Sequence, residues 1–133
     1  MPSDIKIYKI KDFVRFNESG DIDFERSMQI VHELAVAASF YAGNNILIDL
    51  RETTLVMETN IGVILQLASE MAFHASSFKG KMASVVPNEE KRLSIARQVA
   101  ASMQFKGLNF SVFTSFEDAI DWFSEIREVK DPA

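Results

Sequence analysis

The 133-residue chain contains no cysteine. This absence excludes a disulfide scaffold, a thiolate metal site, an iron–sulfur cluster and a cysteine nucleophile. Histidine is nearly as scarce, because His32 and His74 are the only imidazoles and they lie in no metal-binding spacing. His74 follows Glu70 by one helical turn, which is typical of a weak exposed pair on a helix surface. We therefore expect no metal site.

Glycine and proline are also few, at five and three residues. The glycines are scattered and form no GxxxxGKS/T phosphate loop, no GxGxxG dinucleotide fingerprint and no GxSxG nucleophile elbow. A Ser–His–Asp arrangement can assemble from distant positions, but no local pattern supports one here. We expect a protein that is not an enzyme and that has no cofactor.

Positive charge is limited, with 14 Lys and Arg against 19 Asp and Glu and a net charge of −5. The basic pairs 79/81 and 91/92 are isolated and are typical of solvated element ends, so we expect no nucleic-acid partner. The longest uncharged run, residues 34–48, is shorter than the about 20 apolar residues of a membrane span. Charged side chains throughout residues 1–20 leave no signal-peptide core. We expect a cytoplasmic protein that is not an integral membrane protein.

Hydrophobic periodicity predicts strands that alternate with helices. The expected segments are one strand or two short strands over 5–16, a turn over 17–20, a helix over 23–42, a strand over 45–50, a helix over 59–78, a strand over 81–86, a helix between 88 and 107, a strand over 109–113 and a helix from 115. This order predicts an α/β fold with a mostly parallel, four- to five-stranded sheet packed against about four helices. We expect one domain over 1–133 with a frayed tail over 128–133.

Local signals predict where these helices begin and end. Asp21 or Asp23 is suited to cap the first helix, and Asn88 the third. Ser115 with Asp118 resembles a capping box for the last helix. An aromatic-x-Gly pattern precedes three of the strands and predicts a left-handed glycine at each helix end. The glycines of this pattern are Gly43, Gly80 and Gly107.

The second expected helix is apolar over a wide arc within residues 61–78. Such a helix is either deeply buried or partly covered by something outside the chain. Three interpretations remain open: the arc is ordinary core, it is the face of a homodimer, or it lines a pocket for an apolar ligand. The abundance of Phe and Met, at 11 and 6 residues, fits both a core and an adaptable pocket.

The segment between residues 49 and 65 is the most informative part of the sequence. A predicted strand ends at Asp49, a polar loop follows over 51–54, and Thr59 stands at the head of the second helix. Thr59 has two interpretations. It is an ordinary N-cap worth about 1 kcal/mol, or it is a phosphoacceptor whose phosphate would face the free N–H groups of the helix start.

This segment resembles the STAS family, the fold of sulfate-transporter cytoplasmic domains and anti-sigma-factor antagonists, and more narrowly the SpoIIAA-like proteins. The resemblance rests on Asp-Leu at 49–50, on Glu-Thr-Asn-Ile-Gly at 58–62, and on the C-terminal run 112–123 with its Phe-Thr and Ala-x-x-Trp. The chain departs from the antagonists in Glu58 where Asp is usual, in Asn60 where Ser or Gly is frequent, and in Thr59 in place of the commoner Ser.

The resemblance implies a non-enzymatic regulatory module that binds a protein partner, either a kinase or a regulator, and that is switched by phosphorylation at Thr59. The alternative is a carrier or sensor for a small apolar ligand or lipid in a pocket beside the second helix. A homodimer is compatible with either function. The residues expected to form the partner-binding loop are Asp49, Arg51, Thr53, Thr54, Glu58, Asn60 and Ile61.

Overall fold

The computed structural model describes residues 13–41 and 44–124. Predictions for residues 1–12, for Gly43 and for the tail over 128–133 lie outside this part. The elements in chain order are β1 (Phe13–Ile22), α1 (Phe24–Phe40), β2 (Asn45–Leu55), α2 (Ile61–Phe73), a 3₁₀ turn η1 (Ala75–Ser77), β3 (Met82–Val85), α3 (Glu90–Phe105), β4 (Phe110–Phe113) and α4 (Phe116–Ser124). No helix within the described ranges is long and apolar enough to cross a membrane.

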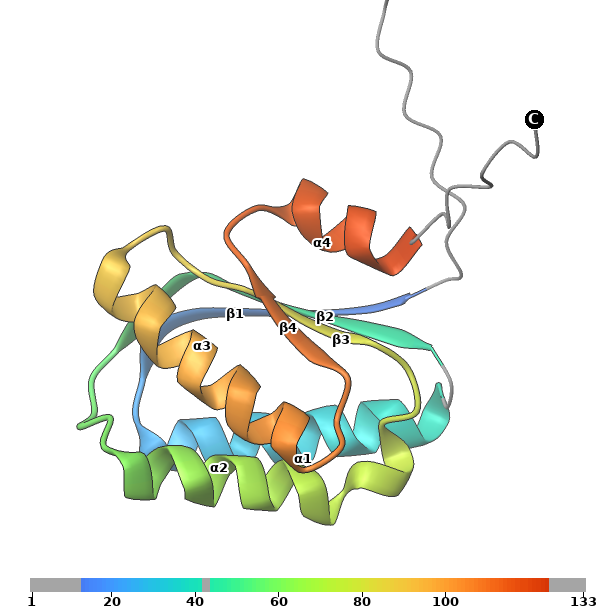
Figure 1. Cartoon of the computed structure of the whole chain (residues 1–133), viewed down its shortest axis with the longest axis horizontal. Helices are drawn as coiled ribbons and strands as arrows, with labels where there is room; N and C mark the ends of the chain where they lie inside the picture. Colours follow the sequence, from blue (N-terminus) through green and yellow to red (C-terminus); the bar gives the residue numbers. More distant parts are fainter. Residues whose placement is uncertain (1–12, 42–43, 125–133) are drawn as a thin grey trace, which may run out of the picture.

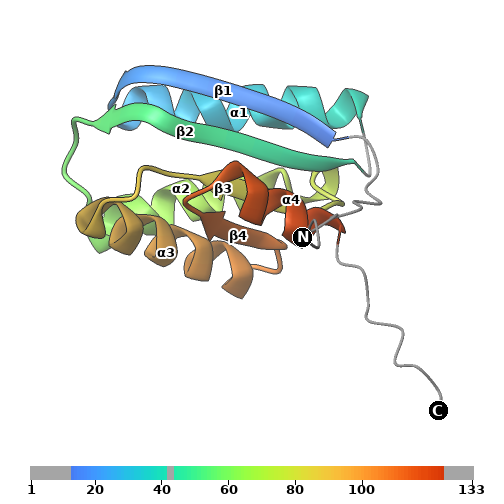
Figure 2. The same ribbon diagram turned by 90° about the horizontal axis from the view of Figure 1, so that it is seen from above.

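The four strands form one parallel sheet in the order β1-β2-β3-β4. Each new strand is added on the same side of the previous one, so right-handed crossovers place α1, α2 and α3 on one face. Helix α4 lies on the opposite face, as Figures 1 and 2 show from two directions. The predicted α/β class, with a mostly parallel sheet of four to five strands packed against about four helices, is confirmed over residues 13–41 and 44–124.

Both faces of the sheet are buried. Alternate residues of β2 point to opposite faces, and Ile46 and Ile48 belong to the large cluster under α1, α2 and α3. Leu47, which has no exposed surface, packs with the smaller cluster under α4. Central strands that are covered on both sides read as continuous apolar runs, and this is how the sequence revealed β2.

Two predicted boundaries are wrong, because β1 and β2 both extend further than expected. Residues 17–20 continue β1 instead of forming a turn, and β2 runs through the predicted loop at 51–54 to Leu55. Asn17 pairs with Asp49 but Ser19 pairs with Glu52, so β2 holds one extra residue across this interval. The turn-forming residues therefore mark a β-bulge within a continuing pair of strands.

The helix starts agree only in part with the predictions. Asp23 caps α1 by accepting from the backbone N–H of Arg26 at 2.7 Å. Ser115 accepts from the backbone N–H of Asp118 at 3.1 Å, as the capping-box pattern predicts. Helix α2 is capped by Asn60, whose Oδ1 accepts from the N–H of Val63 at 3.0 Å. The interpretation of Thr59 as the N-cap is therefore wrong.

Helix α3 begins at Glu90 after its N-cap residue Glu89, and no described side chain caps it, so the prediction that Asn88 caps α3 is also wrong. Helix α2 ends at Phe73, earlier than expected, and the 3₁₀ turn η1 follows it.

The glycines before β3 and β4 serve different purposes. Gly107 has φ +88 and supplies the left-handed residue that the pattern predicts. Gly80 has no positive φ. A Cβ at Gly80 would lie 2.5 Å from the carbonyl oxygen of Asn44, so the backbone of the α1–β2 link passes directly over it. Gly80 is thus required for close approach and not for its backbone angle.

Gly80→Ala should lower the free energy of unfolding by more than about 2 kcal/mol, because a backbone segment has to move. Gly20→Ala is the matched control, since a Cβ there meets nothing within 4 Å and only the φ of +85 is strained, at a cost of about 1 kcal/mol. Urea denaturation measures both variants. Equal decreases in the free energy of unfolding of the two variants would contradict a requirement for glycine where the backbone of Asn44 approaches Gly80.

Candidate functional site

A cavity of about 150 Å³ lies between the sheet and the three helices α1, α2 and α3. Its wall is almost entirely aliphatic or thioether. Side chains that line it from α2 and α3 include Leu67, Met71, Ile95, Ala96, Val99 and Met103. The space persists in part because Ala96 on α3 stands where a larger side chain would fill it.

The wide apolar arc of α2 serves two surfaces. Ile64, Leu67 and Met71 line the cavity, while Ile61 and Leu65 are exposed at 64% and 47%. The arc is therefore partly cavity wall and partly open surface. Of the three interpretations that the sequence left open, ordinary core alone does not account for it.

Arg92, in the first turn of α3, lines the cavity and is 8% exposed. Its guanidinium donates from Nη1 to the carbonyl oxygen of Thr53 at 2.9 Å and from Nη2 to Thr53 Oγ1 at 2.6 Å. Strand β3 pairs with β2 only as far as Asp49, so the edge of β2 beyond that point faces α3 and not another strand. Arg92 satisfies the backbone acceptor that this free edge exposes.

The guanidinium of Arg92 forms no salt bridge with any carboxylate in the described part of the chain. Burial lowers the pKa of Arg92, and the field of Glu89 opposes this shift only in part. A buried cation without a counter-ion is costly, and an arginine does not lose its proton to avoid that cost. This end of the cavity therefore favours an anionic group.

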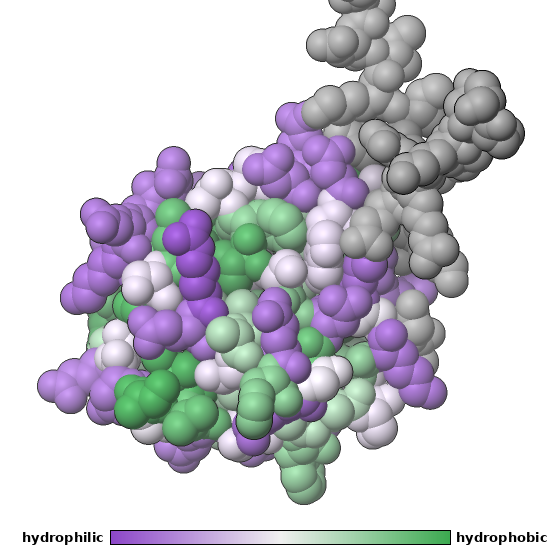
Figure 3. All heavy atoms as spheres, in the orientation of Figure 1, coloured by the Kyte–Doolittle hydropathy of each residue, from purple (hydrophilic) through white to green (hydrophobic). Residues whose placement is uncertain are grey.

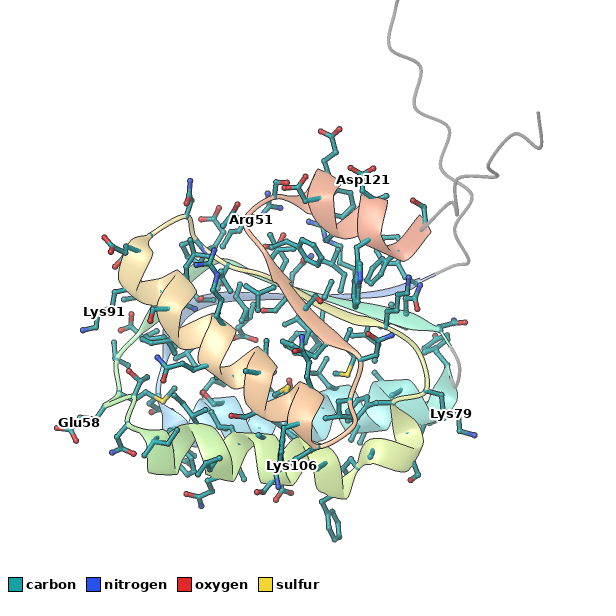
Figure 4. All side chains as sticks on the ribbon, viewed as in Figure 1. Arg51, Glu58, Lys79, Lys91, Lys106 and Asp121 are labelled. Atoms are coloured by element: carbon teal, nitrogen blue, oxygen red, sulfur yellow. The ribbon has the colours of Figure 1, made fainter. Side chains whose placement is uncertain are left out.

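A polar hollow of about 190 Å³ adjoins the cavity, and Arg92 lines both spaces. Thr53, Thr54, Thr59, Glu89 and Lys91 also line the hollow. Figure 4 shows Lys91 at the start of α3 and Glu58 in the β2–α2 link on the same edge of the molecule. An apolar chamber thus continues into a polar one, with a buried cation between them.

The structure does not bring the residues of the predicted partner-binding loop together on one surface, because the β-bulge divides those that lie in β2 between the two faces of the sheet. Asp49 and Arg51 lie on the α4 face. There Asp49 accepts from Arg51 Nη2 at 2.7 Å and from Arg15 Nη2 at 3.0 Å, and Arg15 covers the ring of Phe116. Thr53 is buried on the opposite face against Arg92.

The remaining predicted residues lie at the polar hollow and in the link to α2. Thr54 is exposed and lines the hollow. Glu58, Asn60 and Ile61 are exposed, and Thr59 is half-buried where it lines both the cavity and the hollow. The structure thus brings Thr59 close to Arg92 and separates it from Asp49 and Arg51.

Sequence reasoning missed Arg92, because the Lys91–Arg92 pair was interpreted as a solvated helix end. Lys91 is exposed, but Arg92 is buried. A usable signal was present, since Arg92, Ala96, Val99 and Met103 lie on one helical stripe. A charged residue that continues an apolar stripe is expected to be buried, and a buried charge needs a partner.

One solved structure has a similar fold. The crystal structure of an uncharacterized protein from the DUF3478 family with a SpoIIAA-like fold, from Shewanella loihica PV-4, superposes with a TM-score of 0.53. The alignment covers 92% of this chain and 98% of that chain at 20% sequence identity. No protein-family model matches the sequence, and no curated protein matches it either. The chain therefore has a SpoIIAA-like fold, as the resemblance in its motifs implied.

The hydrogen bonds from Arg51 and Arg15 lower the pKa of Asp49 from 3.8 to about 2, against the opposing effect of burial. Because the folded-state pKa is the lower one, this stabilisation is complete above about pH 4 and is lost as the pH falls towards 2. We expect Asp49→Asn to cost about 1 to 2 kcal/mol at pH 7 and to flatten the stability profile between pH 4 and 2.

Urea unfolding at pH 7, 4 and 2.5 measures this effect. Asp121→Asn is the control, because Asp121 is exposed and forms no salt bridge with the other described residues. The same pH slope in Asp49→Asn and the wild-type protein would contradict the assignment.

Proposed function

We propose that the protein is a non-enzymatic regulatory module that binds a small carboxylate with an apolar body. The observation that carries this proposal is the buried Arg92 at the boundary between the apolar cavity and the polar hollow. The body of the ligand occupies the cavity, and its carboxylate binds the guanidinium.

The size of the cavity limits the apolar body. An engineered protein cavity of similar volume, lined by aliphatic and aromatic side chains, stays dry and binds benzene, so about 150 Å³ suits a body of about six carbons. Met57, Met71 and Met103 line this space, and their unbranched side chains adapt to ligands of different shape. Both a linear and an aromatic body fit this description.

The surroundings of Arg92 favour an anionic head over a neutral one. The first turn of α3 has no side-chain cap from the described part of the chain, so its free N–H groups and the positive end of its dipole add to the field of Arg92 and Lys91. The exposed Glu89 is an opposing charge in the wall. A planar carboxylate matches the two-pronged geometry of a guanidinium.

Calorimetric titration with hexanoate and with hexanol tests the proposal. Hexanoate should bind about tenfold more tightly than hexanol, because a charge-assisted hydrogen bond contributes about 1.5 kcal/mol or more. Arg92→Met should abolish this preference, and Ala96→Phe, which fills the cavity, should weaken the binding of both compounds. Lys106→Met is the matched control, since Lys106 is an exposed cation at the far end of α3 (Figure 4).

Loss of the bonds to Thr53 also destabilises Arg92→Met, so circular dichroism must first show that this variant is folded. If Arg92→Met is unfolded, Ala96→Phe still tests whether the ligands bind in the cavity. An unchanged preference for hexanoate in folded Arg92→Met, or no binding of either compound to the wild-type protein, would contradict the proposal.

A second function is supported by the exposed apolar side chains around the β2–α2 link. Val56, Ile61 and Leu65 are exposed at 52%, 64% and 47%. Figure 3 shows apolar atoms next to hydrophilic ones on this edge of the molecule. Such a mixed patch suits a protein partner, either a kinase, a regulator or a second copy of the chain. Thr59 lies in this link, where phosphorylation would act on the partner surface and the ligand site together.

Thr59→Glu tests that connection. A carboxylate at this position would compete with the ligand for Arg92 and Lys91, so hexanoate binding should weaken about tenfold while hexanol binding stays the same. Thr59→Gln, of similar size but without charge, is the control. Equal effects of Thr59→Glu and Thr59→Gln on hexanoate would remove Thr59 from any charge-based switch.

A further inference from the structure

His32, Glu70 and His74 meet on the outer side of the helical layer, where α1 and α2 lie side by side (Figure 1). His32 comes from α1, Glu70 is in the last turns of α2, and His74 is the residue at the end of α2. His32 Nε2 lies 2.8 Å from Glu70 Oε1, and His74 Nε2 lies 3.5 Å from the same oxygen. The ligand atoms of all three residues lie within 4.8 Å of one another.

Hydrogen bonding within the cluster leaves one atom unsatisfied. The Nε2 atom of His74 is buried from solvent and has no hydrogen-bond partner among the residues that the structure describes. Glu70 Oε1 is already bonded to His32. A buried imidazole nitrogen without a partner is unfavourable, so the cluster is incomplete as a set of hydrogen bonds. A cation between the three groups would satisfy it.

Two imidazole nitrogens and one carboxylate oxygen are a ligand set that zinc favours. In a tetrahedral zinc site with bonds of about 2.0 to 2.2 Å, ligand atoms are about 3.3 Å apart. The distance of 3.5 Å between Glu70 and His74 already fits. The His32 side chain, which is 56% exposed, has room to move outward by the roughly half an ångström that its shorter contact requires.

We propose that His32, Glu70 and His74 bind a divalent zinc ion that links α1 to α2. This site shares no residue with the proposed carboxylate site, because none of its three ligands lines the cavity. Three protein ligands leave a fourth position for water or for a group from a partner. Both helices line the cavity, so the ion fixes the separation of two of its walls.

Calorimetric titration of the full-length chain, without an affinity tag, with zinc chloride at pH 7.5 tests the proposal. We expect one zinc ion per chain with a Kd in the micromolar range or below, and a rise of several degrees in Tm at saturating zinc. His32→Gln, Glu70→Gln and His74→Gln should each weaken binding at least tenfold. Asp121→Asn on α4, on the opposite face of the sheet, should leave it unchanged.

A spectroscopic readout separates this site from unspecific binding. Cobalt(II) in place of zinc should give the intense visible absorption of a tetrahedral ion, and this absorption should disappear in the His32→Gln/His74→Gln double variant. A zinc Kd weaker than about 100 µM, which is the order of magnitude of unspecific surface binding, would overturn the proposal. Equal zinc affinity in the double variant and the wild-type protein would also overturn it. Hexanoate binding is measured separately without zinc, so either proposal can fail alone.

Discussion

The extra residue in β2 determines which side chains of the central segment act together. It shifts the register between β2 and β1 by one residue after Asn17, so that Thr53 and Leu55 point towards the helices. Thr53 then offers its carbonyl and hydroxyl oxygens to Arg92, which holds the first turn of α3 against the free edge of β2. Without the bulge, Thr53 would face the α4 side with Arg51, and Arg92 would be buried without acceptors.

The cavity and the burial of Arg92 both result from the layer of helices on one face of the sheet. Strands added in one direction put three helices on one face of the sheet, and the small side chain of Ala96 on α3 leaves part of the space beneath them unfilled. The same layer buries Arg92 at the edge of that space. An apolar space alone accepts any small hydrophobic molecule, but the adjacent guanidinium adds a preference for an anion. In the proposed function, specificity therefore comes from one buried charge.

Helix and strand periodicity predicted the order of the elements, the parallel sheet and the apolar arc of α2, because each depends on local patterns of burial. The bulge was not predictable, because Asn17, Ser19 and Gly20 are as typical of a turn between two strands as of a bulge within one pair of strands. Because the bulge was not predicted, the separation of Thr53 from Asp49 and Arg51 was not predicted either. The contact between His32 and Glu70 depends on how α1 packs against α2, and the sequence pattern of neither helix specifies this packing. The burial of Arg92 was predictable from the apolar stripe that it continues on α3. That it forms no salt bridge with a described carboxylate could be learned only from the structure.

The most direct test of the central claim is a crystal structure of the protein with 6-bromohexanoate, in which the anomalous signal of bromine locates the apolar end. We predict that the carboxylate binds the guanidinium of Arg92 and that bromine lies in the cavity near Met71 and Met103. A bromine site at the surface, or a carboxylate bound away from Arg92, would contradict the account.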